Sequence, residues 1–271
     1  MAYQKSVAIC IGTSDYSESS QIVTFFTRDF GIIRLIFKGA LRKGRAFKSP
    51  VTLLSLYEIV FSPRKRGLHI LAETALLESF QPLANDLERY YCALAMLDVI
   101  RTQKEEDANT NLFDLFLSSL RCAAAARYAY SLAFSFVLRA FSYLGFEPSF
   151  DSCAKCGAKL QQRVSSSRSP APRQLVAQTG TAGGASLSLR EGGLLCKKCA
   201  TEVKPDLYLS PPAVSALRTL RLLAPERSAL VSLPDRLRRE VAGFLQKFLE
   251  FTFEREFKTV KYLGKSMKSE V

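Results

Sequence analysis

Short runs of apolar residues, separated by turn-forming residues, occupy the first 80 positions of the chain. Runs of this length, bounded by Gly, Pro, Asp and Ser, are typical of β-strands, and five of them in succession favour a small barrel. The predicted strands cover residues 7–11, 20–27, 32–37, 51–61 and 68–77.

The third predicted strand shows a clear alternation of side-chain types. It follows a stretch, residues 28–31, that predicts a hairpin turn. Because successive side chains of a strand point to opposite faces, one face of this strand is expected to pack and the other to carry charge. The packed face is Ile33, Leu35 and Phe37, and the opposite face is Arg34, Ile36 and Lys38.

After Pro82 the apolar residues recur every three or four positions, which indicates amphipathic helices. The first helix is marked by Leu87, Tyr91, Leu94, Ala95 and Ile100, and a polar break follows at residues 103–111. Further helices are predicted at 112–126, at 128–143, at 212–223 and from 235 toward 257.

The change of periodicity predicts an α+β protein in three parts. A five-stranded barrel spans residues 1–80, and an α-helical domain is built from residues 81–150 and 204–271. A small metal-binding finger, residues 151–203, interrupts the helical domain. Its segment at about 165–185 is rich in Ser, Ala, Gly and Pro, a composition that predicts a flexible loop.

The charge balance narrows the class of partner. Against 25 acidic residues stand 38 Lys and Arg, a formal net charge of +13, which suits a polyanion such as DNA, RNA or an anionic membrane surface. No stretch of about 20 apolar residues is present, and the first residues lack the features of a secretory signal. We therefore expect a cytoplasmic protein that does not enter a membrane.

Four of the seven cysteines form two Cys-x-x-Cys pairs, a spacing that lets four sulfurs reach one tetrahedral Zn²⁺. With four protein ligands no position stays open for water, so the ion is expected to support the fold. A redox dithiol or metal-free thiols are the alternatives, but no thioredoxin-like context surrounds either pair. The predicted ligands are Cys153, Cys156, Cys196 and Cys199; Cys10, Cys92 and Cys122 are expected to be small buried apolar residues.

Basic residues concentrate in two segments of the predicted barrel. Phosphates would be met by such cations with little preference for sequence, and together the two segments are expected to line one groove. The alternative is a solvated loop without a partner. The predicted contacts are Arg34, Lys38, Arg42, Lys43, Arg45 and Lys48 in the first segment and Arg64, Lys65 and Arg66 in the second.

Residues suited to catalysis are scarce in the chain. His69 is the single histidine, which excludes a multi-histidine metal site and leaves one histidine as a candidate base. Neither a phosphate-binding P-loop nor a nucleophile elbow is present. Asp15 and Glu18 form an isolated acidic pair in which a turn role is expected. The sequence favours a binding protein over an enzyme.

Several segments together resemble the RecO family of bacterial recombination mediators. The most recognisable runs from Tyr16 through Gly31 to the Lys38-Gly39-Ala40 stretch and the basic loop. Residues 136–148 lead into the first cysteine pair, and Gly192-Gly193 precede the second. A weaker match lies at 248–263. The insert between the cysteine pairs is longer than expected for the family, which leaves the shape of the finger open.

The resemblance implies an OB-fold barrel, a helical domain and a zinc finger in a nucleoid-associated protein. It also implies binding of single- and double-stranded DNA and annealing of complementary strands. RecR, the C-terminal tail of single-strand-binding protein and, indirectly, RecA are the implied partners. The alternative function is a zinc-containing RNA-binding or ribosome-associated factor, because an OB barrel with a basic loop suits RNA too. A redox enzyme is a third alternative.

Overall fold

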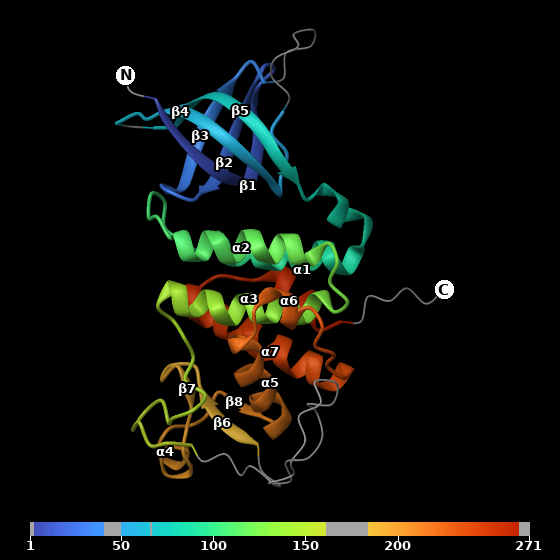
Figure 1. The fold of residues 1–271 in the computed structure, drawn as a ribbon. Coiled ribbons are helices and arrows are strands. Elements are labelled where there is room, and N and C mark those ends of the chain that lie inside the picture. Colours follow the sequence, from blue (N-terminus) through green and yellow to red (C-terminus); the bar gives the residue numbers. More distant parts are fainter. Residues whose placement is uncertain (1–2, 41–49, 66, 161–183, 266–271) are drawn as a thin grey trace.

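A barrel, layers of helices and a small cysteine-bearing sheet succeed one another in space (Figure 1). The computed structural model describes residues 3–40, 50–65, 67–160 and 184–265. The barrel and the small sheet lie at opposite ends of the molecule, and the helices stand between them (Figure 1).

Five strands close the N-terminal barrel. They are β1 (Gln4–Ser17), β2 (Ser20–Thr27), β3 (Gly31–Lys38), β4 (Ser55–Ser62) and β5 (His69–Ser79). Their order around the barrel is β1-β2-β3-β5-β4, and β4 closes on β1; only the β3–β5 pairing among these is parallel. The predicted five-stranded barrel is confirmed, and its architecture is OB-like.

The alternation predicted for the third strand is present in β3. Leu35 and Phe37 are buried in the barrel core with Phe25, while Arg34 and Lys38 are exposed on the outer face. The turn before β3 depends on Gly31, whose φ is +67°. A Cβ atom at this position would stand 2.4 Å from the backbone oxygen of Asp107, so a larger residue does not fit.

Some of the helices begin or end at residues that carry clear capping signals. Asp86 accepts a hydrogen bond from the Arg89 N–H, Asn109 does the same for Leu112, and Gly145 ends a helix in the left-handed conformation. The helices are η1 (Gln81–Asn85), α1 (Leu87–Ile100), α2 (Thr110–Ala123), α3 (Ala129–Leu144), α5 (Pro211–Leu222), α6 (Pro225–Ser228), α7 (Asp235–Phe253) and α8 (Lys258–Leu263). None within the described part of the chain is long and apolar enough to cross a membrane.

One hydrophobic core joins the floor of the barrel to the helices. Barrel residues such as Ile9 and Phe26 belong to the same buried cluster as the helical residues, and the rings of Phe26 and Phe113 lie 5.5 Å apart. At the edge of this contact Arg101 Nε donates to the Ile11 carbonyl at 3.0 Å. Arg28 and Asp114 form an exposed bidentate ion pair. The barrel is therefore held in one orientation on α1 and α2.

The finger is built on a three-stranded sheet of β6 (Ala185–Ser188), β7 (Gly193–Leu194) and β8 (Leu207–Leu209), with the short helix α4 (Lys197–Glu202) beside it. Ala185 already belongs to β6 because it pairs with Leu209. Of the flexible loop predicted at about 165–185, only residues 184 and 185 are described. The rest of it, up to residue 183, lies outside the described residues.

Phe113 tests how much the shared core contributes. Truncation to Ala leaves a cavity against Phe26 and should lower the free energy of unfolding by about 3–5 kcal/mol in a urea titration. The control is Phe251→Ala, because Phe251 is half exposed on α7. Equal effects of the two substitutions would contradict a core that is continuous across the barrel and the helices.

Candidate metal centre and nucleic-acid interface

The first cysteine pair lies in a tight turn whose amides fold back on the chain. The Gly157 N–H donates to the Cys153 carbonyl at 2.8 Å, and the Cys153 N–H donates to Ala158 at the same distance. Gly157 has a φ of +74°, which glycine adopts without strain. This turn brings the Cys156 sulfur to the same side as that of Cys153.

The second cysteine pair lies at the start of α4. Cys196 is the residue that caps this helix, and its sulfur accepts the Cys199 N–H at 3.5 Å. Amide dipoles at the start of a helix stabilise a thiolate. The two pairs meet because the Ala154 N–H donates to Leu194, just before the second pair, at 2.8 Å.

The four sulfurs form a compact cluster. All lie within 4.8 Å of one another, and those of Cys156 and Cys196 are 3.8 Å apart. A tetrahedral zinc ion with Zn–S bonds of about 2.3 Å has sulfurs separated by about 3.8 Å. Four thiolates are a donor set that zinc prefers, so the predicted ligands Cys153, Cys156, Cys196 and Cys199 fit a structural zinc site.

The thiols of the cluster differ in how readily they ionise. Burial raises the pKa of Cys153, but backbone N–H groups of Cys196 and Cys156 among others lower it to about 6 overall. At Cys199, burial and hydrogen bonds to the other thiols raise the pKa to about 12. The Cys153 thiol therefore ionises readily, whereas the Cys199 thiol keeps its proton. A dication bound among the four sulfurs would favour the thiolate form at each of them.

Accessibility argues against a redox dithiol. Cys153 has the low pKa, but its side chain is only 1% exposed, whereas its neighbour Cys156 lies at the surface. A redox-active pair needs an exposed thiol of low pKa. The geometry therefore favours metal binding.

The three remaining cysteines lie apart from the cluster. Cys10 and Cys92 are buried as predicted, and burial raises the pKa of both, to about 12 for Cys10. Cys122 is only half-buried, so that part of the prediction is wrong: its sulfur lies 3.7 Å from a carboxylate oxygen of Glu226. Burial and this carboxylate raise the pKa of Cys122 to about 11, which makes it a poor nucleophile.

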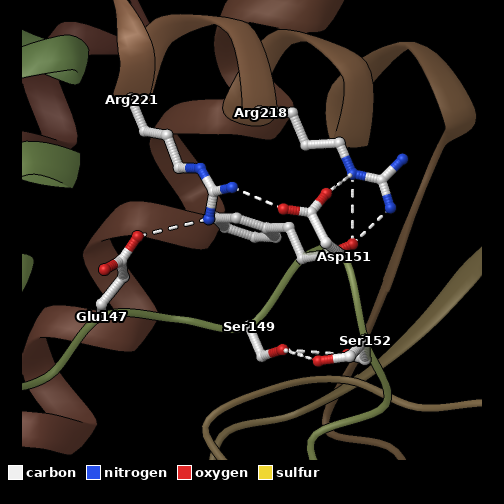
Figure 2. A network of polar contacts seen from close by, with 7 residues as sticks. Glu147, Ser149, Asp151, Ser152, Arg218 and Arg221 are labelled. Atoms are coloured by element: carbon white, nitrogen blue, oxygen red, sulfur yellow. Dashed lines mark hydrogen bonds and ion pairs between the residues drawn. The ribbon is translucent and has the colours of Figure 1, made fainter. Parts of the chain in front are cut away.

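Two arginines of α5 fasten the finger to the helical domain. Arg218 Nε lies 3.0 Å from one carboxylate oxygen of Asp151, and Arg221 Nη2 lies 2.5 Å from the other (Figure 2). Arg221 also pairs with Glu147, and Arg218 donates to the Phe150 carbonyl. Figure 2 shows both guanidinium groups converging on Asp151, in the segment that leads into the first cysteine pair.

A second contact fixes the same segment through its backbone. Backbone bonds of 2.9 Å join Ser149 to Gly192 and to Leu194, one on each side of Gly193. A Cβ atom on Gly193 would stand 2.4 Å from the Ser149 oxygen, so only glycine allows this approach. Ser149 Oγ also donates to the Ser152 carbonyl (Figure 2).

The predicted nucleic-acid contacts that the structure describes lie on the barrel. Arg34 and Lys38 are exposed on the outer face of β3, about 13 Å apart at roughly 3.3 Å per residue. Arg64 and Lys65 are exposed on the connection between β4 and β5. The remaining predicted contacts, Arg42, Lys43, Arg45, Lys48 and Arg66, lie outside the described residues.

The two basic segments leave the barrel at opposite ends of β3. β3 and β5 run parallel, and His69, the first residue of β5, pairs with Leu35 of β3. The β4–β5 connection comes just before His69 and therefore lies near the Gly31 end of β3. The other basic segment follows Lys38 at the far end. The outer face of β3 lies between the two ends at which these segments leave the strand. That all these cations line one groove stays a prediction.

Half-buried apolar side chains lie between the cations on this outer face. Ile36 stands between Arg34 and Lys38, and its partners across the sheet are Ile22 on β2 and Ile70 on β5. The alternation in sequence predicted Ile36 on this face, but not that Ile22 and Ile70 lie beside it. The signal for Ile36 was the even spacing that places it on the charged side of its strand.

His69, at the start of β5, contacts two connecting segments. Its Nδ1 accepts the Arg64 N–H at 3.0 Å, and its Nε2 lies 3.3 Å from a carboxylate oxygen of Glu106. Both ring nitrogens thus have partners, and the histidine ties the basic β4–β5 connection to the segment between α1 and α2. Asp15 and Glu18 are exposed in the β1–β2 hairpin.

Zinc should be bound and lost in a pH-dependent way. Binding requires all four thiolates, so protons compete with the metal. As the pH falls, protons compete more strongly with zinc for the ligand thiolates, and zinc should be released. A chromophoric chelator should therefore extract zinc faster at pH 5 than at pH 7.5. Equal rates at the two pH values would argue against thiolate ligation.

The matched variants for this site are Cys196→Ser and Cys122→Ser. The first should lose zinc and lower the melting temperature by at least about 5 °C, since each ~1 kcal/mol lost shifts a protein of this size by about 2–4 °C. The second removes a half-buried thiol outside the cluster and should retain one zinc per chain. Metal analysis of both variants checks this.

Asp151→Asn tests the contact between finger and helices. The substitution removes the charge that Arg218 and Arg221 share and should weaken the attachment by about 1 kcal/mol, because the carboxylate is half exposed. Amide exchange in residues 150–160 should become faster while the barrel is unchanged. Unaltered exchange in that segment would show that the Ser149–Gly193 contact alone holds the finger.

Two family profiles match the chain. The family described as "Recombination protein O N terminal" matches residues 1–80. The family described as "Recombination protein O C terminal" matches residues 84–261, which include both cysteine pairs. Together the two matches take in the barrel, the finger and the helices.

Curated relatives are similar to this chain over nearly its full length, and each is named DNA repair protein RecO. The protein of Desulforamulus reducens is 24% identical over 270 residues, 99% of this chain and 97% of its own. That of Caldanaerobacter subterraneus is 26% identical over 267 residues, 98% and 99% of the two chains. That of Bacillus pumilus is 26% identical and covers 91% and 88%.

Proposed function

Because the chain belongs to the RecO family of DNA repair proteins, we propose that it is a recombination mediator that binds DNA and anneals complementary strands without a chemical step. The observation that carries the proposal is the outer face of β3, where Arg34 and Lys38 flank Ile36. No residue is assigned a catalytic role.

The outer face of β2 and β3 is where OB folds bind oligonucleotides, together with the β1–β2 and β4–β5 connections. In this chain the β4–β5 connection supplies Arg64 and Lys65, and the β1–β2 hairpin carries Tyr16, which is 62% exposed. Cations suit the phosphates, and Tyr16 offers a ring on which a base can stack. The proposed contacts therefore combine charge with stacking and have little sequence preference.

Annealing follows from this arrangement by electrostatics. Two complementary strands repel each other through their phosphates, and a basic surface lowers that repulsion and raises the rate of encounter. Base pairing then supplies the driving force. With a formal net charge of +13 the whole chain favours association with polyanions.

The proposed partners are RecR, single-strand-binding protein through its C-terminal tail and, indirectly, RecA, which the complex helps to load onto coated DNA. An acidic and apolar tail needs an apolar surface edged by a cation. The α3–α5 edge offers both, because Leu222 is 77% exposed and Arg139 donates to the adjacent Leu223 carbonyl. The proposed location is cytoplasmic and nucleoid-associated.

The proposed zinc ion serves the fold. Its four ligands hold the turn at residues 153–157 against α4, at the end of the molecule away from the barrel (Figure 1). Zinc at this place would cross-link segments that pack few apolar side chains. Because all four ligands would come from the protein, no coordination position would be open for a substrate.

The variant Arg34→Ala/Lys38→Ala tests the DNA surface. Each lost phosphate contact should reduce the slope of log K against log salt concentration for single-strand binding by about 0.7. The slope of the double variant should therefore be smaller by about 1.4, and the variant should bind at least about tenfold more weakly at low salt. Fluorescence anisotropy at several salt concentrations measures both quantities.

The control is Arg227→Ala/Lys247→Ala, which removes two exposed cations from the helical domain. It should keep the slope of the unaltered protein. Competition between matched DNA and RNA oligomers belongs to the same experiment. A clear preference for RNA, or a slope that the barrel variant leaves unchanged, would contradict the proposed DNA surface.

A further inference from the structure

The C-terminal helix α8 lies along α1 with two tyrosines stacked at the surface. The rings of Tyr91 on α1 and Tyr262 on α8 are 4.8 Å apart with an angle of 34° between their planes. Tyr262 is 37% exposed, and Leu87, one turn before Tyr91, is 59% exposed. The three side chains form a platform, which we call the tyrosine platform, that faces solvent.

Three cations lie on or next to α8, the helix that carries Tyr262. Lys261 is exposed on α8, and Lys265, just after the helix, has its Nζ 5.3 Å from the centre of the Tyr262 ring. Arg239 of α7 is exposed beside the end of α8, because its Cα lies 3.5 Å from the Cβ position of Gly264. Within the described part of the chain none of the three forms an ion pair with an acidic residue.

The acidic groups near the platform are already engaged. Glu88 lies 3.7 Å from the guanidinium of Arg238, which is buried beneath the platform. Asp98, at the other end of α1, accepts the Thr259 hydroxyl at 2.6 Å. Asp86, next to Leu87, lies 3.5 Å from Arg89. Among the described residues, the charged groups of this surface that form no ion pair therefore include the three cations.

The short helix α8 is held in place by buried polar contacts. The Nε of Arg238 donates to the Leu263 carbonyl at 2.6 Å, and its guanidinium stacks 4.0 Å from the centre of the Tyr130 ring. At the start of the helix Arg255 donates to the Asp98 carbonyl. A helix of six residues would otherwise fray, so these contacts keep the platform rigid before any ligand binds.

We propose that the tyrosine platform, with Arg239, Lys261 and Lys265, is a second binding site for single-stranded nucleic acid. Exposed aromatic rings next to cations are the combination that binds such strands, with bases on the rings and phosphates on the cations. The site deepens the proposed annealing function and rests on it: one strand lies on the barrel and the complementary strand lies on the platform.

Stoichiometry tests this site without reference to annealing. An oligothymidylate of about eight nucleotides matches the length that one such site covers. In a tight-binding titration the unaltered protein should bind two of these oligomers, and Lys261→Ala/Lys265→Ala should bind one. The control Arg227→Ala/Lys247→Ala removes the same charge elsewhere and should still bind two.

Substitutions of Tyr262 separate stacking from charge. Tyr262→Ala should weaken the second binding event by about tenfold, within the range for a lost stack of a base on an aromatic ring. Tyr262→Phe keeps the ring and should bind as the unaltered protein does. Thermal melting of both variants shows whether either has lost its fold, and cross-linking of bromouracil oligomers to Tyr262 gives a readout that does not depend on the substitutions.

Distinct outcomes would overturn the site or the proposed function. Binding of one short oligomer by the unaltered protein, or of two by Lys261→Ala/Lys265→Ala, would overturn the second site. The second site would also be overturned if Lys261→Ala/Lys265→Ala lost binding only to vesicles containing phosphatidylglycerol and not to the oligomers. That result would assign the platform to an anionic membrane surface. Two bound oligomers with no acceleration of annealing would leave the site standing and contradict the proposed function alone.

Discussion

The arrangement of the molecule depends on one continuous hydrophobic core between the barrel floor and the helices. Because Phe26 of β2 and Phe113 of α2 pack in the same cluster, the barrel packs on the helical layer in one position. The close approach of Gly31 to Asp107 and the Arg101 bond to Ile11 fix its rotation. Surfaces on the barrel, on α1 and on α8 therefore keep constant distances from one another.

Fixed distances would favour the proposed annealing of two strands. A strand on the outer face of β3 and a strand on the tyrosine platform would be brought together by a rigid body, so that only the nucleic acid has to move. The finger lies at the opposite end (Figure 1), where its cysteines and the Arg218–Asp151 contact stabilise the chain as it leaves and rejoins the helical layer.

Features that depend on neighbouring residues were predictable from the sequence. The strand predicted at 20–27 is β2 residue for residue, and the helix marked by Leu87 to Ile100 is α1. The ligand set was predictable because each Cys-x-x-Cys turn is a local structure. Burial of Cys122 was predicted wrongly, because apolar neighbours in sequence do not show that a half-covered helix face meets Glu226.

Features that join distant segments were not predictable from periodicity. Asp151 and Arg221 are 70 residues apart, and the insert between the cysteine pairs separates them. Likewise Tyr91 and Tyr262 meet because contacts of Arg238, Arg255 and Thr259 hold α8 against α1. Neither tyrosine stands out within its own segment. The net charge of the sequence indicated a polyanionic partner. The structure adds the places where aromatic rings lie next to cations.

The measurement that tests the account most directly follows annealing of complementary oligonucleotides coated with single-strand-binding protein, with and without this protein, at two salt concentrations and without nucleotide. The account predicts acceleration that weakens as salt rises, because phosphate contacts carry it. Retained DNA binding with no acceleration at either salt concentration would contradict it and leave a general nucleic-acid-binding protein.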